Sequence, residues 1–583
     1  MRQLRGSEEE QALAPASTPP KPYPRLFFWC LVLVLGLLRV WAHRNEVSPD
    51  GISYIEIAWA AARSGLQQVV NGHWSPLYPS LLSLVFRCFH PPVQWEFTAA
   101  HLLNFALYAA SLASFELFLR ELILLRQTGG ESGEKSLPIP PESIWIWGHV
   151  YFLWASYFWL DPAWVTPDLC VAVLVYFASG LLMRIRRGQG AWLVFVGFGA
   201  ALGLGYLAKT AMFPLAFVFL FSAFYLSRIA GASFRAAALH TLLAMGVFAG
   251  LALPQIISLS AQKGRPTFGD AGRLNYAMYI GGAPKWVHWH GQPPGTGVPL
   301  HAMRQLSFDP ALYEFGEPIP GSYPLWYDPS YWYEGVRPHF ELKGQLRALF
   351  RSANMYLKIF SKSGALWVVF VVLWVAKRRA IAWGSFAPGT WLVVLPSIAA
   401  LGMYSLVLVE FRYVAPFTLV LLMWMLGRMR MVAGAEPRWL KRSLLVVVLA
   451  PVLAVTWAVA RDLYEVVRNQ PYEPWIVAQG LHEMGIPPGA HLGCIGIGLD
   501  AYWAHLAGVR IVAEITDTEQ PLFVAANARR RQEILGLFST AGAKAVVTKN
   551  AAAANPEDGW RAIPGTQYFI WQQQWLIAAP EKK

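Results

Sequence analysis

The topology of this chain depends on one short segment, Leu77-Tyr78-Pro79-Ser80-Leu81-Leu82-Ser83-Leu84-Val85-Phe86-Arg87-Cys88-Phe89. The segment is apolar, but its length is typical of an interfacial or re-entrant helix, since a full membrane span needs about 20 residues. Counting it as a span would also move every later basic link to the other side of the membrane. We therefore predict that this segment, like the amphipathic stretch 52–62, is a helix lying on the outer membrane surface.

The composition is that of a polytopic membrane protein. Hydrophobic residues make up 55% of the chain, charged residues only 14%, and the mean hydropathy is +0.36. The net charge of +13 would also suit a nucleic-acid-binding protein. However, the basic residues cluster in short links between apolar runs, which is the pattern of cytoplasmic loops. We expect membrane lipids as partners and no nucleic acid. The four cysteines are scattered, which indicates neither a disulfide framework nor a zinc site.

The links between apolar segments predict eleven membrane spans, with the N-terminus in the cytoplasm and the C-terminus outside. Arg184, Arg186 and Arg187 follow the fourth span, and further basic clusters follow the other even-numbered ones. All these links then lie on the side of the N-terminus, as the positive-inside rule requires. The predicted spans are 26–42, 95–119, 143–160, 168–184, 191–208, 210–227, 237–258, 364–376, 389–408, 413–431 and 443–460.

Three parts of the chain differ in character. Residues 1–24 are polar and proline-rich, which predicts a disordered cytoplasmic tail. Residues 25–460 form the transmembrane part, with outer surface helices in 51–90 and a long outer loop at 259–363. That loop is rich in aromatic residues, as in Trp286-Val287-His288-Trp289-His290 and in 323–332, so we expect it to be folded.

Residues 461–583 predict a small extracytoplasmic α/β domain. Short apolar strands at 491–495, 509–513 and 543–547 alternate with helical patterns. Gly496 and Gly498 lack the third glycine of a dinucleotide-binding turn, so we interpret them as a tight strand-to-helix turn.

Several ionisable groups fall at the outer ends of predicted spans. Each one alone is explained by helix-end anchoring, snorkelling or the helix dipole. Two carboxylates and two cations on one membrane face together indicate a site, because ionisable groups beside apolar spans face a cavity or one another. The two carboxylates are Asp50 and Asp168, and the two cations are Lys209 and Arg412, with Glu410 and Tyr413 beside Arg412.

The arrangement resembles the GT-C class of glycosyltransferases, and within it the aminoarabinose and protein O-mannosyl transferase branch of family-39-like enzymes. Pro49-Asp50-Gly51-Ile52-Ser53-Tyr54 fits the Pro-Asp-Glu-x-x-Tyr-type motif after the first span, Asp168 the second acid, and Ala208-Lys209 the pair that ends a glycine-rich span. Two positions depart from the pattern. Gly51 replaces an acid, and Ser75-Pro76 replaces the Lys-Pro expected to contact the carrier phosphate, a contact that His73 would have to supply.

The resemblance implies a multi-pass enzyme of the bacterial cytoplasmic membrane. It would move a sugar from a polyprenyl-phosphate carrier to an acceptor that is a lipid, a glycan or a protein. Asp50 is the candidate general base. Asp168 would orient the acceptor, hold Lys209, or bind a divalent metal together with Asp50. Lys209 and Arg412 would stabilise the leaving phosphate. The other candidate substrate-binding residues are Tyr54, His73, Trp74, Glu410 and Tyr413.

Two other functions fit parts of the sequence. A transporter or flippase of lipid-linked sugars would use intramembrane charges as a pathway and often contains inverted repeats. No internal repeat is visible, and the polar groups collect on one face instead of at mid-depth, which favours the enzyme. A membrane-anchored assembly factor would leave the Asp50, Asp168 and Lys209 set without a role.

Overall fold

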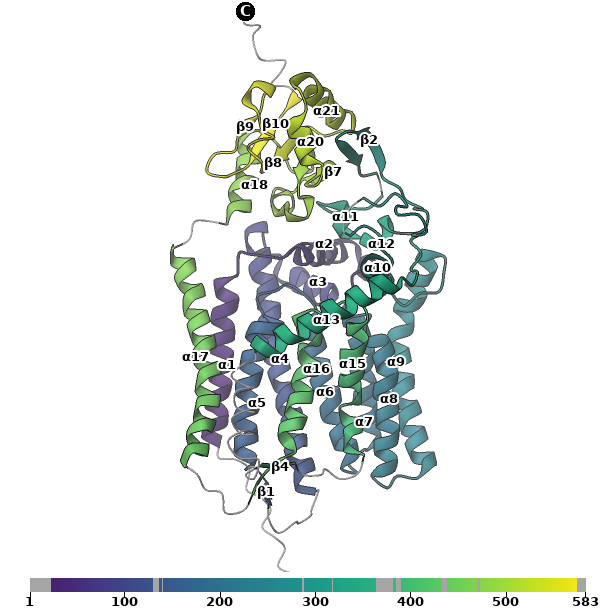
Figure 1. Cartoon of the computed structure of the whole chain (residues 1–583), viewed down its shortest axis with the longest axis vertical. Helices are drawn as coiled ribbons and strands as arrows, with labels where there is room; N and C mark the ends of the chain where they lie inside the picture. Colours follow the sequence, from purple (N-terminus) through teal and green to yellow (C-terminus); the bar gives the residue numbers. More distant parts are fainter. Residues whose placement is uncertain are drawn as a thin grey trace, which may run out of the picture.

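The computed structural model describes residues 22–128, 136–138, 140–285, 288–316, 318–362, 381–383, 389–432, 438–468 and 472–573. A bundle of long, roughly parallel helices carries a smaller α/β unit at one end (Figure 1). This end is called the upper end below, as Figure 1 shows it.

Every predicted span that lies within the described residues coincides with a helix of the bundle. Five of these helices are long and apolar enough to cross a membrane, and shorter apolar helices accompany them. The predicted span 364–376 lies outside the described residues, so the number eleven stays a prediction. The bundle elements are α1 (Pro22–Ala42), α4 (Val93–Thr128), α5 (Pro141–Ala155), η2 (Ser156–Leu160), α6 (Asp168–Arg186), α7 (Trp192–Ala208), α8 (Met212–Ile229), α9 (Phe234–Lys263), η3 (Thr390–Val393), α15 (Leu395–Ser405), α16 (Phe411–Gly427) and α17 (Arg438–Arg468).

The two predicted surface helices lie at the upper end of the bundle, beneath the α/β unit (Figure 1). They are α2 (Pro49–Ser64) and α3 (Leu77–Phe89), which pack against each other and are linked by η1 (Leu66–Val69). At about 1.5 Å per residue, α3 reaches only about 20 Å. The 13-residue segment is thus a helix at the upper end of the bundle that is too short to span a membrane, and its place on the outer membrane surface stays a prediction.

The start of α2 is determined locally. The Ser48 hydroxyl accepts a hydrogen bond from the Gly51 amide at 3.3 Å, and Pro49 occupies the first turn, where its fixed φ suits a helix and its missing N–H costs nothing. Asp50 follows in the same turn, next to the positive end of the helix dipole.

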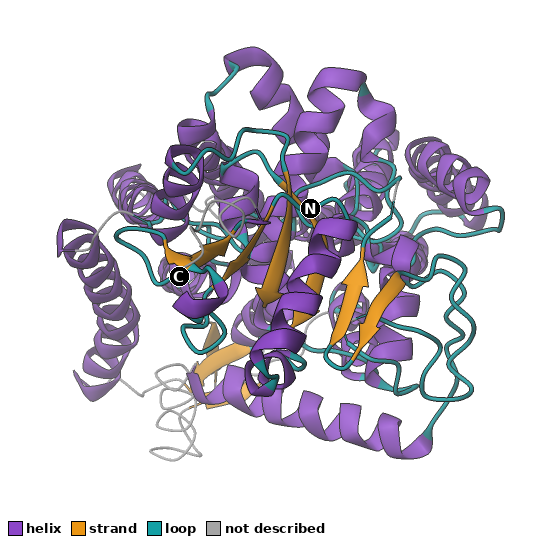
Figure 2. Cartoon of the chain, turned by 90° about the horizontal axis from the view of Figure 1, so that it is seen from above, coloured by secondary structure: helices purple, strands orange, loops and turns teal. Residues whose placement is uncertain are grey.

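The upper unit is built around a seven-stranded sheet with strand order β2-β3-β7-β6-β8-β10-β9, seen from above in Figure 2. The predicted strands near 491, 509 and 543 form its centre, where β6 pairs in parallel with both β7 and β8. The chain turns sharply after β6 at Gly496, whose φ is 126°, and enters η4 as expected for a strand-to-helix turn. The strands are β2 (Arg304–Phe308), β3 (Ala311–Glu314), β6 (His491–Gly496), β7 (Arg510–Thr516), β8 (Ala545–Thr548), β9 (Arg561–Ala562) and β10 (Phe569–Trp571).

Two of these strands come from the long loop 259–363, so the sheet joins segments far apart in the chain. The loop is folded, as its aromatic content predicted. The carbonyl of Trp326 accepts hydrogen bonds from Ser53 on α2 and from the indole of Trp74, at 3.0 and 3.1 Å. Residues 286 and 287 lie outside the described residues. The loop helices are α10 (Ala271–Tyr279), α11 (Pro324–Tyr327), α12 (Pro329–Trp332) and α13 (Leu342–Lys362).

The remaining elements complete the two ends of the molecule. A three-stranded sheet of order β1-β5-β4 lies at the lower end of the bundle (Figure 1). Its strands are β1 (Ser136–Pro138), β4 (Ile381–Trp383) and β5 (Met429–Val432), while the upper unit also contains α18 (Glu473–Glu483), η4 (Gly498–Asp500), α19 (Tyr502–Leu506), α20 (Gln520–Ala525), α21 (Ala528–Thr540) and η5 (Pro556–Asp558).

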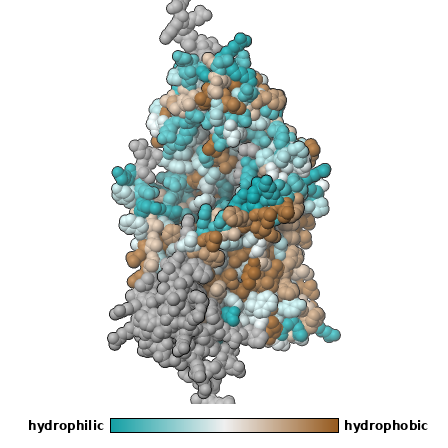
Figure 3. All heavy atoms as spheres, viewed as in Figure 1, coloured by the Kyte–Doolittle hydropathy of each residue, from teal (hydrophilic) through white to brown (hydrophobic). Residues whose placement is uncertain are grey.

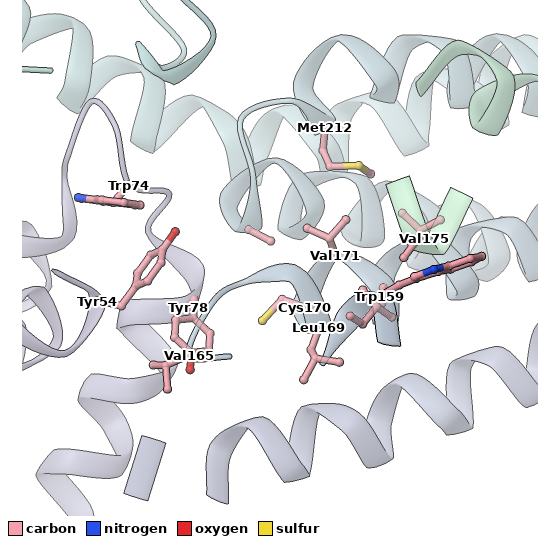
Figure 4. Packing of buried hydrophobic residues seen from close by; sticks show 14 of the residues in the cluster. Tyr54, Trp74, Tyr78, Trp159, Val165, Leu169, Cys170, Val171, Val175 and Met212 are labelled. Carbon is pink, nitrogen blue, oxygen red and sulfur yellow. The ribbon is translucent and has the colours of Figure 1, made fainter. Parts of the chain in front are cut away.

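The core is continuous from the bundle into the surface helices. Figure 4 shows Tyr54 beside Trp74 and Tyr78, with Val165 nearby. The ring centroid of Tyr54 lies 5.1 Å from that of Trp74 and 5.3 Å from that of Tyr78, both in edge-to-face geometry. The visible surface carries a hydrophobic band across the bundle, below a more hydrophilic upper unit (Figure 3). The four cysteines are free thiols, of which Cys170 and Cys494 are buried.

Candidate active site

A cavity of about 480 Å³ lies at the upper end of the bundle, where several helix ends meet. The start of α2, the start of α6, the turn between α7 and α8, and the start of α16 all contribute to its wall. The segment 265–275, before and within α10, forms another side. Among the residues named from the sequence, those lining the cavity are Asp50, Tyr54, His73, Trp74, Asp168, Lys209, Arg412 and Tyr413.

Two carboxylates and two cations form one connected network in this cavity. The Arg412 guanidinium lies between the carboxylates, with Nη2 at 2.7 Å from Asp50 Oδ2 and Nη1 at 3.5 Å from Asp168 Oδ2. Lys209 Nζ lies 2.6 Å from Asp168 Oδ1. Residues separated by hundreds of positions in the chain are thus neighbours, on the common face that the span order predicted.

Asp168 is the buried centre of the network. Its side chain is 2% exposed, whereas that of Asp50 is 20% exposed. Asp168 also accepts a hydrogen bond from the Thr166 hydroxyl at 2.9 Å. Both of its oxygens therefore contact neighbouring groups, which suits holding Lys209 and Arg412 in place. Asp50 has the greater access to the cavity.

Helix ends help to stabilise three of the four charges. Asp50 and Asp168 lie in the first turns of α2 and α6, where the helix dipole favours a negative charge. Lys209 caps the C-terminus of α7, where a positive charge is favoured. Arg412 lies in the first turn of α16, against its helix dipole. Its two carboxylate partners offset that cost.

Burial and charge act against each other at Lys209. Burial of the ammonium group lowers its pKa, while Asp168 raises it, and the result is a pKa of about 8. The ammonium also lies 3.4 Å from the centroid of the Tyr413 ring. Lys209 is therefore mainly protonated at neutral pH and is the titratable cation of the cavity nearest to that range.

The absence of a second acid beside Asp50 has a steric cause. Gly51 is buried, and a Cβ placed there would lie 2.3 Å from Val47 Cγ2 and 3.0 Å from Val165 Cβ. The wall behind α2 is packed too closely for any side chain at this position. Asp50 is thus a lone carboxylate on its helix, and its charged neighbours come from α6 and α16.

His73 lines the cavity but does not supply a positive charge. Burial lowers the pKa of this imidazole to about 4, so it is neutral at pH 7. The contact that His73 would supply in place of the Lys-Pro pair is therefore one made by a neutral ring, and it stays a prediction. A neutral ring remains able to donate or accept a hydrogen bond.

Glu410 is the one named residue outside the cavity wall. It lies immediately before α16, and burial raises the pKa of its carboxyl group. The cavity wall continues past it with Arg412 and Tyr413.

The structure adds cavity residues that the sequence did not single out. Arg265, Asp270 and Arg273 also line the cavity, and Arg265 Nη2 lies 2.8 Å from both oxygens of Asp270. The sequence contained one signal for these residues. Arg265 and Asp270, separated by Pro266 and Gly269, form a charged pair soon after the predicted span 237–258. Outside the cavity lining, the Arg412 guanidinium also lies 5.1 Å from the centroid of the Trp164 ring.

A divalent metal shared by Asp50 and Asp168 does not fit the arrangement of these side chains. The Arg412 guanidinium takes the bridging position between the two carboxylates. Within the described part of the chain, no group of three or more His, Cys, Asp or Glu side chains is placed to hold a metal ion.

Comparisons with known proteins establish the fold. No protein-family profile and no curated protein sequence matches the chain. Two crystal structures of ArnT from Cupriavidus metallidurans are similar over 94% of this chain and 97% of theirs. The apo structure shares 13% identity with a TM-score of 0.52, and the structure bound to undecaprenyl phosphate shares 14% with a TM-score of 0.54. An Archaeoglobus fulgidus oligosaccharyltransferase in complex with zinc and sulfate matches at 13% identity and a TM-score of 0.43, over 89% of this chain and 67% of that one. The chain thus has the predicted GT-C fold.

Proposed function

We propose that this protein is an integral-membrane glycosyltransferase that takes a sugar from a polyprenyl-phosphate carrier. One observation carries the proposal: Asp50, Asp168, Lys209 and Arg412 converge on a single cavity at one end of the bundle. A solved structure of the same fold, ArnT, is bound to undecaprenyl phosphate. A pair of cations held by carboxylates suits a phosphate-bearing ligand of that kind.

The two cations have different parts in this reaction. Arg412 presents a planar fork that matches two phosphate oxygens, and Lys209 offers a compact point charge. Before the donor binds, both are neutralised by Asp50 and Asp168, which spares the cavity two unpaired charges. Asp168 acts as a positioning residue, because it holds both cations from a buried site.

Asp50 is the proposed general base. The acceptor hydroxyl loses its proton to the Asp50 carboxylate, and the acceptor oxygen bonds to the anomeric carbon of the sugar. The bond between that carbon and the phosphate oxygen breaks, and its electron pair stays on the phosphate. Lys209 and Arg412 stabilise this charge as the polyprenyl phosphate departs.

The cavity faces the extracytoplasmic side in this proposal. It lies at the upper end of the bundle, while basic links such as Arg184-Ile185-Arg186-Arg187 end α6 at the other end. By the positive-inside rule the lower end faces the cytoplasm of a bacterial cytoplasmic membrane. The acceptor is then a lipid, glycan or protein outside the cytoplasm.

The test is donor consumption by the full-length protein in nanodiscs. Undecaprenyl phosphate released from a panel of undecaprenyl-phosphate-linked sugars is measured, with a membrane extract as the source of acceptor. Asp50→Asn is expected to lower turnover by about 10²- to 10⁴-fold, the usual contribution of a general base. Glu46→Gln removes an exposed carboxylate just before α2 and serves as the matched control.

The outcomes separate the two candidate activities. Turnover by Asp50→Asn equal to that of the wild type would remove Asp50 from the mechanism. Transbilayer movement of the intact lipid-linked sugar, without release of undecaprenyl phosphate, would show a flippase instead.

A further inference from the structure

Helix α13 has three distinct faces along its 21 residues. The buried face consists of Gly344, Ala348, Ser352 and Ile359, whose intervals of four and seven residues place them on one side of the helix. This face packs on the bundle. The Ser352 hydroxyl donates to the Ser405 carbonyl at 2.9 Å, and the Tyr356 hydroxyl donates to the Leu401 carbonyl at 2.7 Å, both on α15.

The second face is apolar and exposed. It projects large side chains at the same spacing, several of which are more than half exposed. In a soluble protein such a continuous apolar stripe would mark an interaction site. Its members are Leu342, Leu346, Leu349, Phe350, Leu357 and Phe360.

The third face is basic. It carries Lys343, Arg347, Arg351 and Lys358, all exposed, and no acidic residue occurs between 342 and 362. Glu341 Oε2, just before the helix, lies 3.7 Å from Arg347 Nη2. Lys285 adds to the positive charge: burial and the charges of Arg351 and Arg347 lower the pKa of its ammonium group.

The position of α13 fits a membrane interface. It crosses the bundle obliquely near the upper end (Figure 1), where hydrophilic atoms meet the hydrophobic band (Figure 3). A shallow, open groove of about 730 Å³ lies along the exposed side of α13, and its lining among the described residues, between Leu342 and Lys358, comes from both exposed faces of this one helix. Such a groove offers apolar side chains to an acyl chain and basic side chains to a phosphate.

We propose that α13 is an in-plane interfacial helix whose groove binds anionic phospholipid from the surrounding leaflet. The apolar face enters the acyl region, and the basic face contacts the headgroup phosphates. Basic residues close to an anionic membrane surface attract it with additive strength, as amphipathic surface helices do. Since α13 is hydrogen-bonded to α15, whose end contributes Met403 and Tyr404 to the cavity wall, the bound lipid buttresses that wall.

The test maps lipid contacts on the full-length protein in phosphatidylcholine nanodiscs. A photoreactive phosphatidylglycerol is titrated in, and its crosslinks are located by mass spectrometry. Crosslinks are expected in the peptides of α13, and unlabelled phosphatidylglycerol is expected to compete far better than phosphatidylcholine. The readout contains no sugar and no transfer reaction, so it is independent of the proposed function.

The variant Lys343→Gln, Arg347→Gln, Lys358→Gln is expected to weaken phosphatidylglycerol labelling about a hundredfold, at about fivefold per charge removed. A control variant, Arg304→Gln, Arg529→Gln, Lys544→Gln, removes three exposed charges from the upper unit and leaves labelling unchanged. If the triple variant does not fold, Lys358→Gln is expected to weaken labelling about fivefold and Lys358→Arg not at all.

Three outcomes would overturn the proposal. Equal competition by phosphatidylcholine would mean that the groove does not recognise charge. Unchanged labelling of both α13 variants would remove the basic face from lipid binding. Phosphatidylglycerol crosslinks that are absent from the α13 peptides would mean that the apolar face is covered by something other than lipid.

Discussion

Replacing Lys209 by arginine tests the proposed chemistry through its dependence on pH. Burial lowers the pKa of Lys209 to about 8, with Asp168 opposing the shift. If the lysine must be charged to stabilise the leaving phosphate, wild-type turnover falls above this pH by about tenfold per pH unit. Arginine stays protonated throughout this range, so the Lys209→Arg variant is expected to lose the alkaline decline.

The free energy of unfolding is expected to rise over the pH range in which turnover falls. The folded state releases the Lys209 proton near pH 8, whereas the unfolded chain holds it to about 10.5. Between these values the unfolded state binds more protons, so the stability rises with pH. The difference of 10.5 − 8 = 2.5 in pKa corresponds to about 3 kcal/mol.

The assay compares kcat/KM for the donor and the unfolding temperature, from neutral pH to about 10.5. Lys209→Met is the stability reference, because its side chain does not titrate. The free energy of unfolding of the wild type minus that of Lys209→Met should rise while wild-type turnover falls. An alkaline decline in Lys209→Arg equal to that in the wild type would refute the reasoning.

Three further predictions follow from the same contacts. Arg412→Lys is expected to raise the KM for the donor about 10- to 100-fold. The reason is that an ammonium group cannot bridge Asp50 and Asp168 as the guanidinium does. An unchanged KM would contradict this prediction. Burial lowers the pKa of His505, but Glu56 and Glu96 outweigh it and hold it at about 9. Its charge then contributes stability that is full below about pH 6.5 and lost as the pH rises through about 9, so the thermal deficit of His505→Asn should shrink across that range. Gly51→Ala is expected to cost about 1–3 kcal/mol of stability because its Cβ meets Val47, while Gly246→Ala, with no neighbouring atom, should cost nothing; equal unfolding temperatures would contradict it.

The sequence alone determined which segments are helices and which ends of them face the same way. Apolar run length separates the surface helix α3 from the spans, and the alternation of basic links sets the relative direction of each span. Both signals are local, and the bilayer makes them strong, because backbone polar groups in hydrocarbon must be paired within a helix. The same alternation predicted that Asp50, Asp168, Lys209 and Arg412 lie at one end of the bundle.

Only the tertiary structure determined which charged groups in that site contact one another. The sequence left three roles open for Asp168. In the structure Asp168 contacts Lys209 and Arg412, because α6 packs against α16 and against the turn after α7. The sequence did not explain why position 51 is a glycine, which the contacts of Val47 and Val165 require, nor that burial lowers the pKa of His73 and keeps it neutral. The sheet of the upper unit also contains β2 and β3, which precede its central strands by more than a hundred residues in the chain. Such features depend on distances between segments remote in the chain, and no local pattern of residues encodes those distances.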